Sequence, residues 1–476
     1  MGNPKAFLTI PRKEAGYRPV HERIHDFGEV EQTLNTRDRQ EQASRCMDCG
    51  VPFCHWACPL GNKDPEWNDA LYHGDWETAY KILKKTNDFP EFTGRICPAL
   101  CEKACVLYLT TGEAVTNREN EAAIAERAFL EGYVTIEHPV RNGKKVAVIG
   151  GGPAGLAAAN QLNYRGYEVT VFDRNEAAGG LLRYGIPNFK LPKNIIDRRI
   201  RVMMDEGVHF VYDTDLSLRL LAKKDFSGPN AVLEDFDAYV VATGTPQARD
   251  LQAPGRELKG IHLALDLLAQ QNRVLAGTDG VYTEQSRGGK TERVTARNKR
   301  VLVIGGGDTG SDCIGTAHRQ GARSVTQIEI MPQPPVGHNP STPWPNWPVI
   351  MKTTSSHEEG CDRRWLLNTN RFIDDGHGNV KGVEVEGVIW EPNPDGGRPT
   401  MKLDGNKEVI PCDIVFLAMG FLRPQQPFFD EEGKKRSNCA NIFLAGDAAS
   451  GASLVVRAIA SGRKTAEEID KFLGGK

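Results

Sequence analysis

The chain has 476 residues, of which 39% are hydrophobic, enough for about three domains with sizeable cores. Its 59 Lys and Arg against 62 Asp and Glu give a formal net charge of −3, so no strong field favours nucleic acid or an anionic membrane as a partner. The first 20 residues contain no apolar targeting segment, and no apolar run is long enough to span a bilayer. We therefore expect a soluble, cytoplasmic protein.

The N-terminal region, residues 1–144, is polar and rich in cysteine, with helical patterns at residues 30–45, 76–85 and 121–131. Seven of the 11 cysteines lie between Cys46 and Cys105. In a cytoplasmic protein, clustered cysteines indicate metal or cluster ligands before disulfides. The other four have no ligand spacing, and we interpret them as small buried hydrophobes: Cys313, Cys361, Cys412 and Cys439.

The spacing of the seven cysteines is similar to that of ferredoxins. The first group is Cys46-x2-Cys49-x4-Cys54-x3-Cys58-Pro59, two residues longer in the middle than the bacterial run. The second group is Cys97-Pro98-x2-Cys101-x3-Cys105. Because Pro98 suits the first turn of a helix, this spacing predicts three thiols on one helical face.

The ligand count favours two [4Fe–4S] clusters with one ligand missing from the cysteines. Two such clusters need about eight protein ligands, and the groups supply seven. A non-cysteine residue could complete the set, and the candidates are Glu102, Glu113, Glu121 and His55. Zinc is the competing interpretation, but seven thiols divide badly into tetrahedral sets. A third interpretation is that the cysteines are free structural thiols.

A glycine-rich βαβ pattern begins at residue 146 and predicts a dinucleotide site. Gly150-x-Gly152-x-x-Gly155 follows a short apolar strand and opens a helix, and Asp173 ends the next strand, where a carboxylate binds ribose hydroxyls. The following Gly179-Gly180-Leu181 and the late Gly446-Asp447 are typical of flavoproteins with two dinucleotide sites. These features predict bound FAD.

A second such pattern begins at residue 301 and predicts the nicotinamide site. Its fingerprint is Gly305-x-Gly307-x-x-Gly310. Arg323 could contact the 2′-phosphate of NADPH, whereas Glu329 would prefer the free 2′-hydroxyl of NADH, so the choice between them stays open. Residues 276–299 are expected to form a loop, and the Pro- and Trp-rich residues 332–348 an extended surface segment.

These patterns together predict an α/β chain of three domains. A helical iron–sulfur domain (1–144) precedes two Rossmann-like domains, a discontinuous one for FAD (145–250 and 411–476) and one for NAD(P)H (251–410). The turns at Ala242-Thr243-Gly244 and Ala418-Met419-Gly420 are expected to cross between them. The segment after the FAD motif, GGLLRYGIP, contains no cysteine, so we expect electrons to leave through the N-terminal clusters rather than through a disulfide.

The chain resembles the small (beta) subunits of glutamate synthase along essentially its whole length. The resemblance rests on CMDCGVPFC with its trailing CP, GRICPALCEKAC, VIGGGPAGLAAA, GGLLRYGIPNFKLP, VLVIGGGDTGSDC, LAMGF and FLAGDAASGASLVVRAIASGR. The same module occurs in dihydropyrimidine dehydrogenase. The resemblance implies an electron-input subunit for glutamate biosynthesis and ammonia assimilation, with a large (alpha) subunit as partner in a hetero-oligomer.

The resemblance also implies roles for individual residues. One cluster would be held by Cys46, Cys49, Cys54 and Cys105, and the other by Cys58, Cys97, Cys101 and Glu121. The implied FAD contacts are Gly150, Gly151, Gly152, Pro153, Ala154, Gly155, Asp173, Gly180, Leu181, Lys190, Gly446 and Asp447. The implied NADPH (or NADH) contacts are Gly305, Gly306, Gly307, Asp308, Thr309, Gly310, Arg323, Ala418, Met419 and Gly420.

The resemblance assigns hydride transfer to stacked cofactors and not to a catalytic side chain. It leaves two alternatives open. The same module could serve a ferredoxin-type oxidoreductase with a different partner, or the chain could be a scaffold with degenerate sites. The intact glycine fingerprints and cysteines argue against the scaffold.

Overall fold

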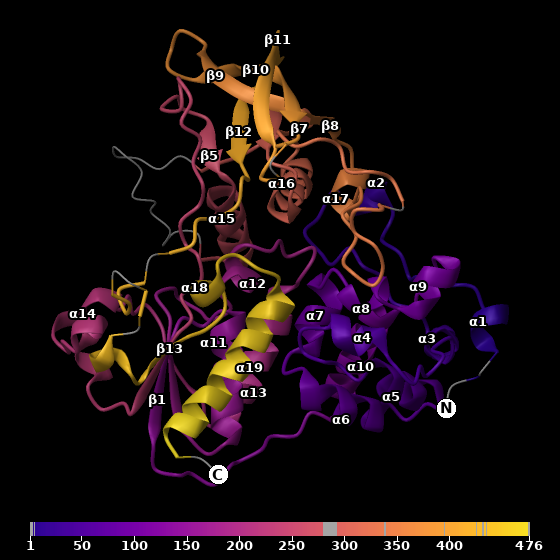
Figure 1. The fold of residues 1–476 in the computed structure, drawn as a ribbon, viewed down its shortest axis with the longest axis vertical. Helices are drawn as coiled ribbons and strands as arrows, with labels where there is room; N and C mark the ends of the chain where they lie inside the picture. The colour runs from indigo at the N-terminus through magenta and orange to yellow at the C-terminus, as the bar shows by residue number, and fades with distance from the viewer. Residues whose placement is uncertain are drawn as a thin grey trace.

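The computed structural model describes residue 3 and residues 5–278, 293–337, 339–394, 396–424, 426–430, 433–434 and 436–474. A helical domain lies beside a unit built on one parallel sheet, and a second sheet unit lies above that one (Figure 1). Part of the predicted loop, residues 279–292, lies outside the described residues. No helix among the described residues is long and apolar enough to cross a membrane.

The N-terminal domain is all helical. Its helices are α1 (Ala6–Thr9), α2 (Val20–Arg23), α3 (Thr36–Ser44), α4 (Phe53–Ala57), α5 (Asp64–Tyr72), α6 (Trp76–Thr86), α7 (Pro90–Ile96), α8 (Leu100–Lys103), α9 (Val106–Thr111) and α10 (Asn117–Leu130). Trp67, Tyr80, Leu83 and Ile124 are among the residues of its core. The cysteine-bearing segments are loops and short helices beside the longer α5, α6 and α10.

Two of the three predicted helices are confirmed and one is shorter than expected. Helix α6 covers the pattern at 76–85, and α10 contains most of 121–131. The pattern at 30–45 is helical only from Thr36, because the Asn35 side chain accepts a hydrogen bond from the Asp38 amide at 2.9 Å and so caps α3 there. Glu31 instead forms an antiparallel bridge with Tyr17.

The first sheet unit is a parallel five-stranded sheet in the order β13-β4-β1-β2-β3. Its elements are β1 (Lys145–Ile149), β2 (Glu168–Phe172), β3 (His209–Val211), β4 (Ala238–Val241), β13 (Ile442–Leu444), α11 (Pro153–Tyr164), α12 (Leu181–Tyr184), α13 (Lys193–Asp205), α14 (Leu218–Lys223), α18 (Asp447–Ser450) and α19 (Val455–Phe472). Helices α11 and α19 lie side by side (Figure 1). Gly462 permits this approach, since a Cβ there would lie 2.1 Å from the Ala154 carbonyl oxygen.

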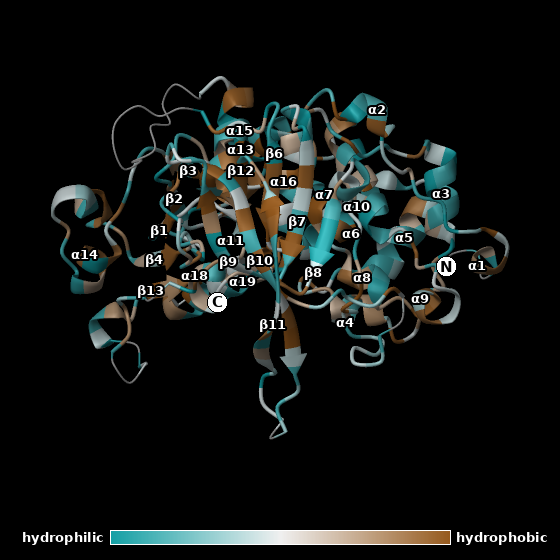
Figure 2. Ribbon diagram, turned by 90° about the horizontal axis from the view of Figure 1, so that it is seen from above, coloured by the Kyte–Doolittle hydropathy of each residue, from teal (hydrophilic) through white to brown (hydrophobic). Residues whose placement is uncertain are grey.

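The second sheet unit repeats this plan in the order β5-β12-β6-β7-β8. Its elements are β5 (Ile261–Leu263), β6 (Arg300–Ile304), β7 (Ser324–Glu329), β8 (Asp362–Trp365), β12 (Ile414–Leu417), α15 (Ala264–Ala276), α16 (Asp308–Arg319) and α17 (Ser355–Glu358). The central strands of both sheets, such as β1, β4, β6 and β12, are short, apolar and buried, as parallel sheets require, whereas the edge strands β3 and β8 are partly exposed. Figure 2 shows the hydrophobic colour gathered in central strands such as β6 and β7.

The sheet order corrects one predicted boundary. Strand β12 pairs with β5 and β6, so residues 414–417 belong to the second sheet and the chain returns to the first only after Leu417, not at residue 411. The two predicted crossing points agree with this topology, because Ala242 follows β4 of the first sheet and Ala418 follows β12 of the second.

The sequence patterns did not reveal the third sheet. Strands β9 (Leu367–Asp374), β10 (Val380–Glu391) and β11 (Thr400–Pro411) form an antiparallel sheet on the second unit. In Figure 2, β11 projects from the body of the molecule. Polar residues alternate irregularly along these strands, and the register shifts between Glu386 and Val388, which hides the period of two.

Buried ion pairs join the helical domain to the first sheet unit. Arg199 on α13 donates to both carboxylate oxygens of Glu91 on α7, at 2.6 and 3.2 Å. Asp88 accepts from Arg463 of α19 at 2.6 Å and from Asn160 of α11 at 2.7 Å. Buried pairs of this kind are strongly destabilised by loss of one partner, so they fix the orientation of the two parts.

Candidate cofactor sites

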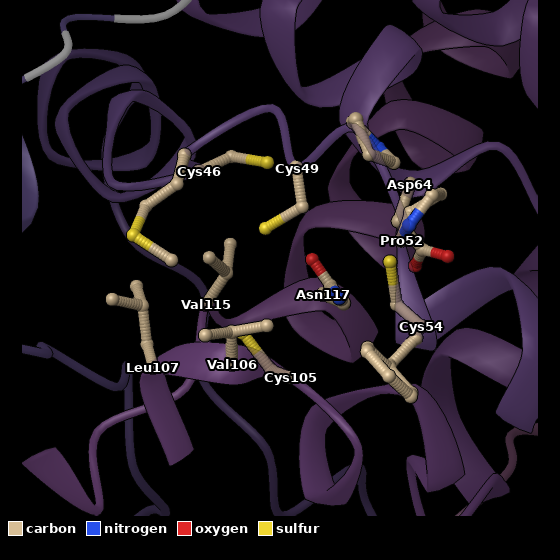
Figure 3. Close-up of a pocket in the computed structure, with 13 residues that line it drawn as sticks. Cys46, Cys49, Pro52, Cys54, Asp64, Cys105, Val106, Leu107, Val115 and Asn117 are labelled. Carbon is tan, nitrogen blue, oxygen red and sulfur yellow. The ribbon is translucent and has the colours of Figure 1, made fainter. Parts of the chain in front are cut away.

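The first cysteine set surrounds one cavity. Cys46, Cys49, Cys54 and Cys105 line it together, with Asp64 at its side (Figure 3). Cys46 and Cys49 lie on the loop after α3, Cys54 on α4 and Cys105 at the start of α9. Residues more than 50 positions apart in the sequence thus present four thiols to one space, which fits the ligand number of a [4Fe–4S] cluster.

The second set gathers where the ends of α4 and α7 meet α8. Cys101 lies close enough to Cys58 and Cys97 for their charges to interact, and Glu121 interacts with Cys58 and Cys97 in the same way. Burial raises the pKa of Cys58 and of Cys97 to about 12, opposed in part by backbone hydrogen bonds. A buried thiolate needs a nearby cation or cluster to offset its charge, so these donors fit a metal group.

The predicted single helical face for the second group is wrong. Cys97 ends α7, Cys101 lies on the four-residue α8, and Cys105 begins α9. Ala99 breaks the helix because it adopts a left-handed conformation with φ of 61°. The breaks send Cys105 to the first set and Cys97 and Cys101 to the second, a separation that one straight helix could not make.

Glu121 is buried with the second set and is held by three polar side chains. Its Oε2 accepts from Asn62 Nδ2 at 3.2 Å, and its Oε1 accepts from Asn87 Nδ2 at 3.1 Å and from the Thr93 hydroxyl. Burial raises the pKa of Glu121 to about 7. The other three candidates have other partners: Glu102 accepts from Arg12 and from the Arg118 amide, Glu113 accepts from the Arg12 amide, and His55 lies 3.4 Å from Glu66. Glu102 and His55 nevertheless lie near thiols, Glu102 beside Cys101 and His55 beside Cys54.

Asp64 is a buried carboxylate that the sequence analysis missed. It lines the first cavity, and its charge also interacts with Cys58 and Cys101 of the second set. Its Oδ2 has no hydrogen-bond partner among the described residues. Together with Cys54 and His55 it forms a group whose ligand atoms lie within 4.8 Å of one another. Asp64 has no cysteine-like spacing signal, and only its burial reveals it.

The glycine loop after β1 has the geometry of a dinucleotide site. Gly150 has a φ of 105°, and a Cβ on Gly155 would lie 1.9 Å from the Gly150 carbonyl oxygen. At Gly152, by contrast, the nearest atom to a Cβ is 3.9 Å away. Gly150 and Gly155 are therefore required by the turn and the helix packing, whereas Gly152 leaves open space at the start of α11, where a pyrophosphate would approach.

The remaining predicted FAD residues border this loop. Asp173 Oδ2 accepts from the Gly151 amide at 2.8 Å. A Cβ on Gly180 would lie 2.8 Å from the Gly152 Cα, and one on Gly446 would lie 2.6 Å from the Ala154 Cβ. Leu181 is an apolar side chain left 44% exposed beside the loop, and Asp447, Pro153 and Ala154 are the first residues of α18 and α11. Segments nearly 300 residues apart thus converge at one edge of the sheet.

A hollow lies where this unit meets the segment after Cys58. It is lined by Pro59, the residue after Cys58, and by Gly451, Ser453 and Arg457 in and before α19. Ser453 donates to Asp447 at 2.7 Å, so one lining residue contacts a predicted FAD residue. Leu60, two residues after Cys58, and Ile96, one before Cys97, pack against the core of the first sheet unit, so the second set lies on the side of that unit.

The second glycine loop repeats the first in detail. Gly305 has a φ of 119°, and a Cβ on Gly310 would lie 2.5 Å from the Gly305 carbonyl oxygen. Glu329 Oε2 accepts from the Gly306 amide at 2.5 Å, as Asp173 does from Gly151. A Cβ on Gly307 would meet no atom of the described residues within 4 Å beyond its chain neighbours, so the start of α16 is open there. Asp308 and Thr309 begin that helix, and Ala418, Met419 and Gly420 follow the adjacent β12.

Arg323 does not lie where it was expected, and Lys190 has a partner in the other sheet unit. Arg323 immediately precedes β7 while Glu329 ends it, so the two are about 20 Å apart along the strand. Nucleotides bind at the carboxyl ends of parallel strands, and the expectation that Arg323 contacts a 2′-phosphate is wrong. Lys190 Nζ pairs with Asp312 Oδ1 of α16 at 2.6 Å across the two sheet units, and its contact with FAD stays a prediction.

The Pro- and Trp-rich segment is a surface loop, as expected, but it also contacts the helical domain. Trp344 packs on Phe53 with ring centroids 4.6 Å apart. Phe53 lines the first cysteine cavity. The second sheet unit is thereby held against the first cysteine set as well as against the first sheet.

Two family profiles match the chain. One described as dihydropyrimidine dehydrogenase domain II, 4Fe–4S cluster, matches residues 23–132, and one described as pyridine nucleotide-disulphide oxidoreductase matches residues 144–341. Among solved structures, FprA of Mycobacterium tuberculosis in complex with NADPH aligns with a TM-score of 0.52 at 16% identity, covering 70% of this chain and 85% of that one. This likeness shows the fold of the two sheet units.

Curated relatives cover the whole chain. The glutamate synthase [NADPH] small chain of Mycobacterium tuberculosis is 43% identical over 100% of this chain and 97% of its own length. That of Bacillus subtilis is 38% identical over 100% and 99%. The glutamate synthase [NADH] of Schizosaccharomyces pombe is 38% identical over 99% of this chain but only 23% of its own length.

Proposed function

The chain belongs to the family of glutamate synthase small chains, and from that premise we propose that it takes electrons from NADPH or NADH and delivers them to a large subunit that makes glutamate. The observation that carries the proposal is the hollow in which Pro59, the residue after Cys58, lies with Ser453, which donates to the predicted FAD residue Asp447. The S. pombe relative supports the choice of partner, because it continues far beyond the matched region in one polypeptide.

Each cofactor has donors that fit it. The loops at Gly152 and Gly307 leave open space at the starts of α11 and α16 for the pyrophosphates of FAD and of the nicotinamide cofactor. The two cysteine sets, completed by Glu121, supply eight donors for two [4Fe–4S] clusters. Bound FAD would accept a hydride from the nicotinamide and release electrons singly to the clusters.

The placement of Pro59 supports an order for the route. Pro59, next to Cys58 of the second set, lines the hollow beside the predicted FAD residue Asp447, whereas no cysteine of the first set lines it, so we place the second set nearer the flavin. The Lys190–Asp312 pair and the buried contacts of Arg23 with Glu359 hold the second sheet unit against the rest, at 2.6 and 2.9 Å. These contacts hold the two nucleotide sites at a fixed distance and orientation. Stacking of the reacting rings then does not require one sheet unit to rotate against the other.

The test uses the purified chain with and without its large subunit. We expect a brown protein with bound FAD and about eight irons that oxidises NADPH with ferricyanide as acceptor. Glutamate should form from glutamine and 2-oxoglutarate only after the large subunit is added. Glutamate formation by this chain alone would contradict the proposal, as would a colourless protein after anaerobic reconstitution.

A second candidate function keeps the same chemistry with another acceptor. The putative oxidoreductase AegA of Escherichia coli is 32% identical over 98% of this chain, and the match covers 71% of its own length. The protein that co-purifies from native cells distinguishes the two: a very large amidotransferase subunit supports the first function, and a small ferredoxin-like protein the second.

A further inference from the structure

Three large apolar side chains are exposed around the first cysteine set. Val51 is 72% exposed, Trp56 65% and Leu109 54%. Exposure of a tryptophan to this extent forgoes a large burial energy, and contiguous apolar patches rimmed by polar groups mark interaction sites. We name these three residues the Trp56 patch.

The patch and the first cysteine set are parts of the same short segments. Val51 follows Cys49 by two residues, Trp56 follows Cys54 by two, and Leu109 follows Cys105 by four. Two residues span at most about 7 Å, and four residues of a helix rise about 6 Å. Helices α4, α8 and α9 lie near one another in both views (Figures 1 and 2). Each residue of the patch is therefore within about 7 Å of chain from a cysteine of the first set.

The second set shares Trp56, which precedes Cys58 by two residues, but its other apolar neighbours are covered. Leu100, beside Cys101, is only 8% exposed, and Ala99, two residues after Cys97, is 6% exposed. Leu60, two residues after Cys58, packs against the core of the first sheet unit. Among the described residues, the first set therefore has the larger exposed apolar surroundings for a second protein to approach.

We propose that the Trp56 patch is the docking surface for the acceptor subunit, a protein that carries its own one-electron centre. This rests on the proposed function and names the place where its partner binds. Electron transfer slows steeply with distance, so the acceptor's centre must come close to the first set, and the patch is the exposed apolar surface beside that set. His55, Lys63 and Glu66 provide a polar rim, and the tryptophan provides an anchor of the kind that dominates interfaces.

The experiment measures binding of the holoenzyme to the large subunit from the same organism by surface plasmon resonance. Variants are Trp56→Ser on α4 and, in case that short helix is disturbed, Leu109→Ser on α9. The matched control is Leu130→Ser, an 82% exposed leucine at the end of α10 in the same domain. Iron and FAD content are measured for every variant, because they report the cofactor sites independently of docking.

We expect Trp56→Ser to raise Kd by about 10- to 30-fold, Leu109→Ser to raise it several-fold, and Leu130→Ser to leave it unchanged, all with wild-type iron. Wild-type Kd in both patch variants would overturn the proposal. It would also be overturned if the variants changed only self-association in sedimentation velocity, since the patch would then join two copies of this chain. Failure of the wild type to oxidise NADPH with ferricyanide would instead refute the proposed function, so the two failures are distinguishable.

Discussion

The ion pair between Glu91 and Arg199 is the main buried charge contact between the helical domain and the first sheet unit. Their side chains are 0% and 3% exposed, and the guanidinium lies 5.0 Å from the centroid of the Phe129 ring. In Glu91→Ala the arginine keeps its charge although its main partner is gone, because arginine does not deprotonate in proteins. We expect the variant to lose about 3–5 kcal/mol from the free energy of the first unfolding transition.

The matched control is an exposed pair with the same chemistry. Arg18 and Asp26 are joined at 2.6 Å, with side chains 28% and 47% exposed, so Asp26→Ala should cost at most about 1 kcal/mol. Urea unfolding followed by circular dichroism and flavin fluorescence measures both. The double variant Glu91→Leu/Arg199→Met should recover most of the loss, because no unpaired charge remains. Equal costs below about 1 kcal/mol for Glu91→Ala and Asp26→Ala would refute the reasoning that burial makes this pair important.

Four further outcomes test the sites. Glu121→Ala should reduce iron from about eight to about four per chain with FAD retained, and unchanged iron and spectra would remove it from the ligands. In Gly155→Ala the new Cβ would lie 1.9 Å from the Gly150 carbonyl oxygen, so this variant should lose about 1–3 kcal/mol of unfolding free energy together with its FAD. Gly307→Ala should keep its stability and FAD but raise KM for NADPH, because a Cβ there meets no atom of the described residues. Equal losses of stability in the two variants would contradict the packing argument. Arg323→Ser should leave KM for NADPH unchanged, because the residue lies at the wrong end of β7. Burial lowers the pKa of His262 and His357 to about 4, below the unfolded value of about 6.5, so the unfolded chain binds more protons and stability falls as pH drops through 6.5 toward 4. Between about pH 7 and 5.5 each of the two histidines should contribute about 1 kcal/mol to this loss of stability. His357→Gln should therefore halve the loss that the two histidines cause, whereas substitution of the exposed His21 by Gln should leave it unchanged.

The sequence alone was sufficient to predict those features that depend on residues close together along the chain. The glycine spacings at Gly150 and Gly305 predicted both parallel sheets and the loops over α11 and α16, since the turn, the helix start and the strand are all within 10 residues. The spacing of the first four cysteines likewise predicted cluster ligands, because these residues lie within 13 positions of one another. The crossings at Ala242 and Ala418 could be placed because each directly follows an apolar strand.

Only the tertiary structure decided what depends on distant segments meeting. Arg323 and Glu329 are neighbours in sequence, yet strand geometry carries them to opposite ends of β7. Asp64 comes between the cysteine sets because α5 is buried against them, and Lys190 meets Asp312 because two separate sheets face each other. The left-handed turn at Ala99 divides one cysteine group between two sites. Sequence spacing specifies the chemistry of each segment, but long-range packing, to which every element contributes, decides which segments share a site.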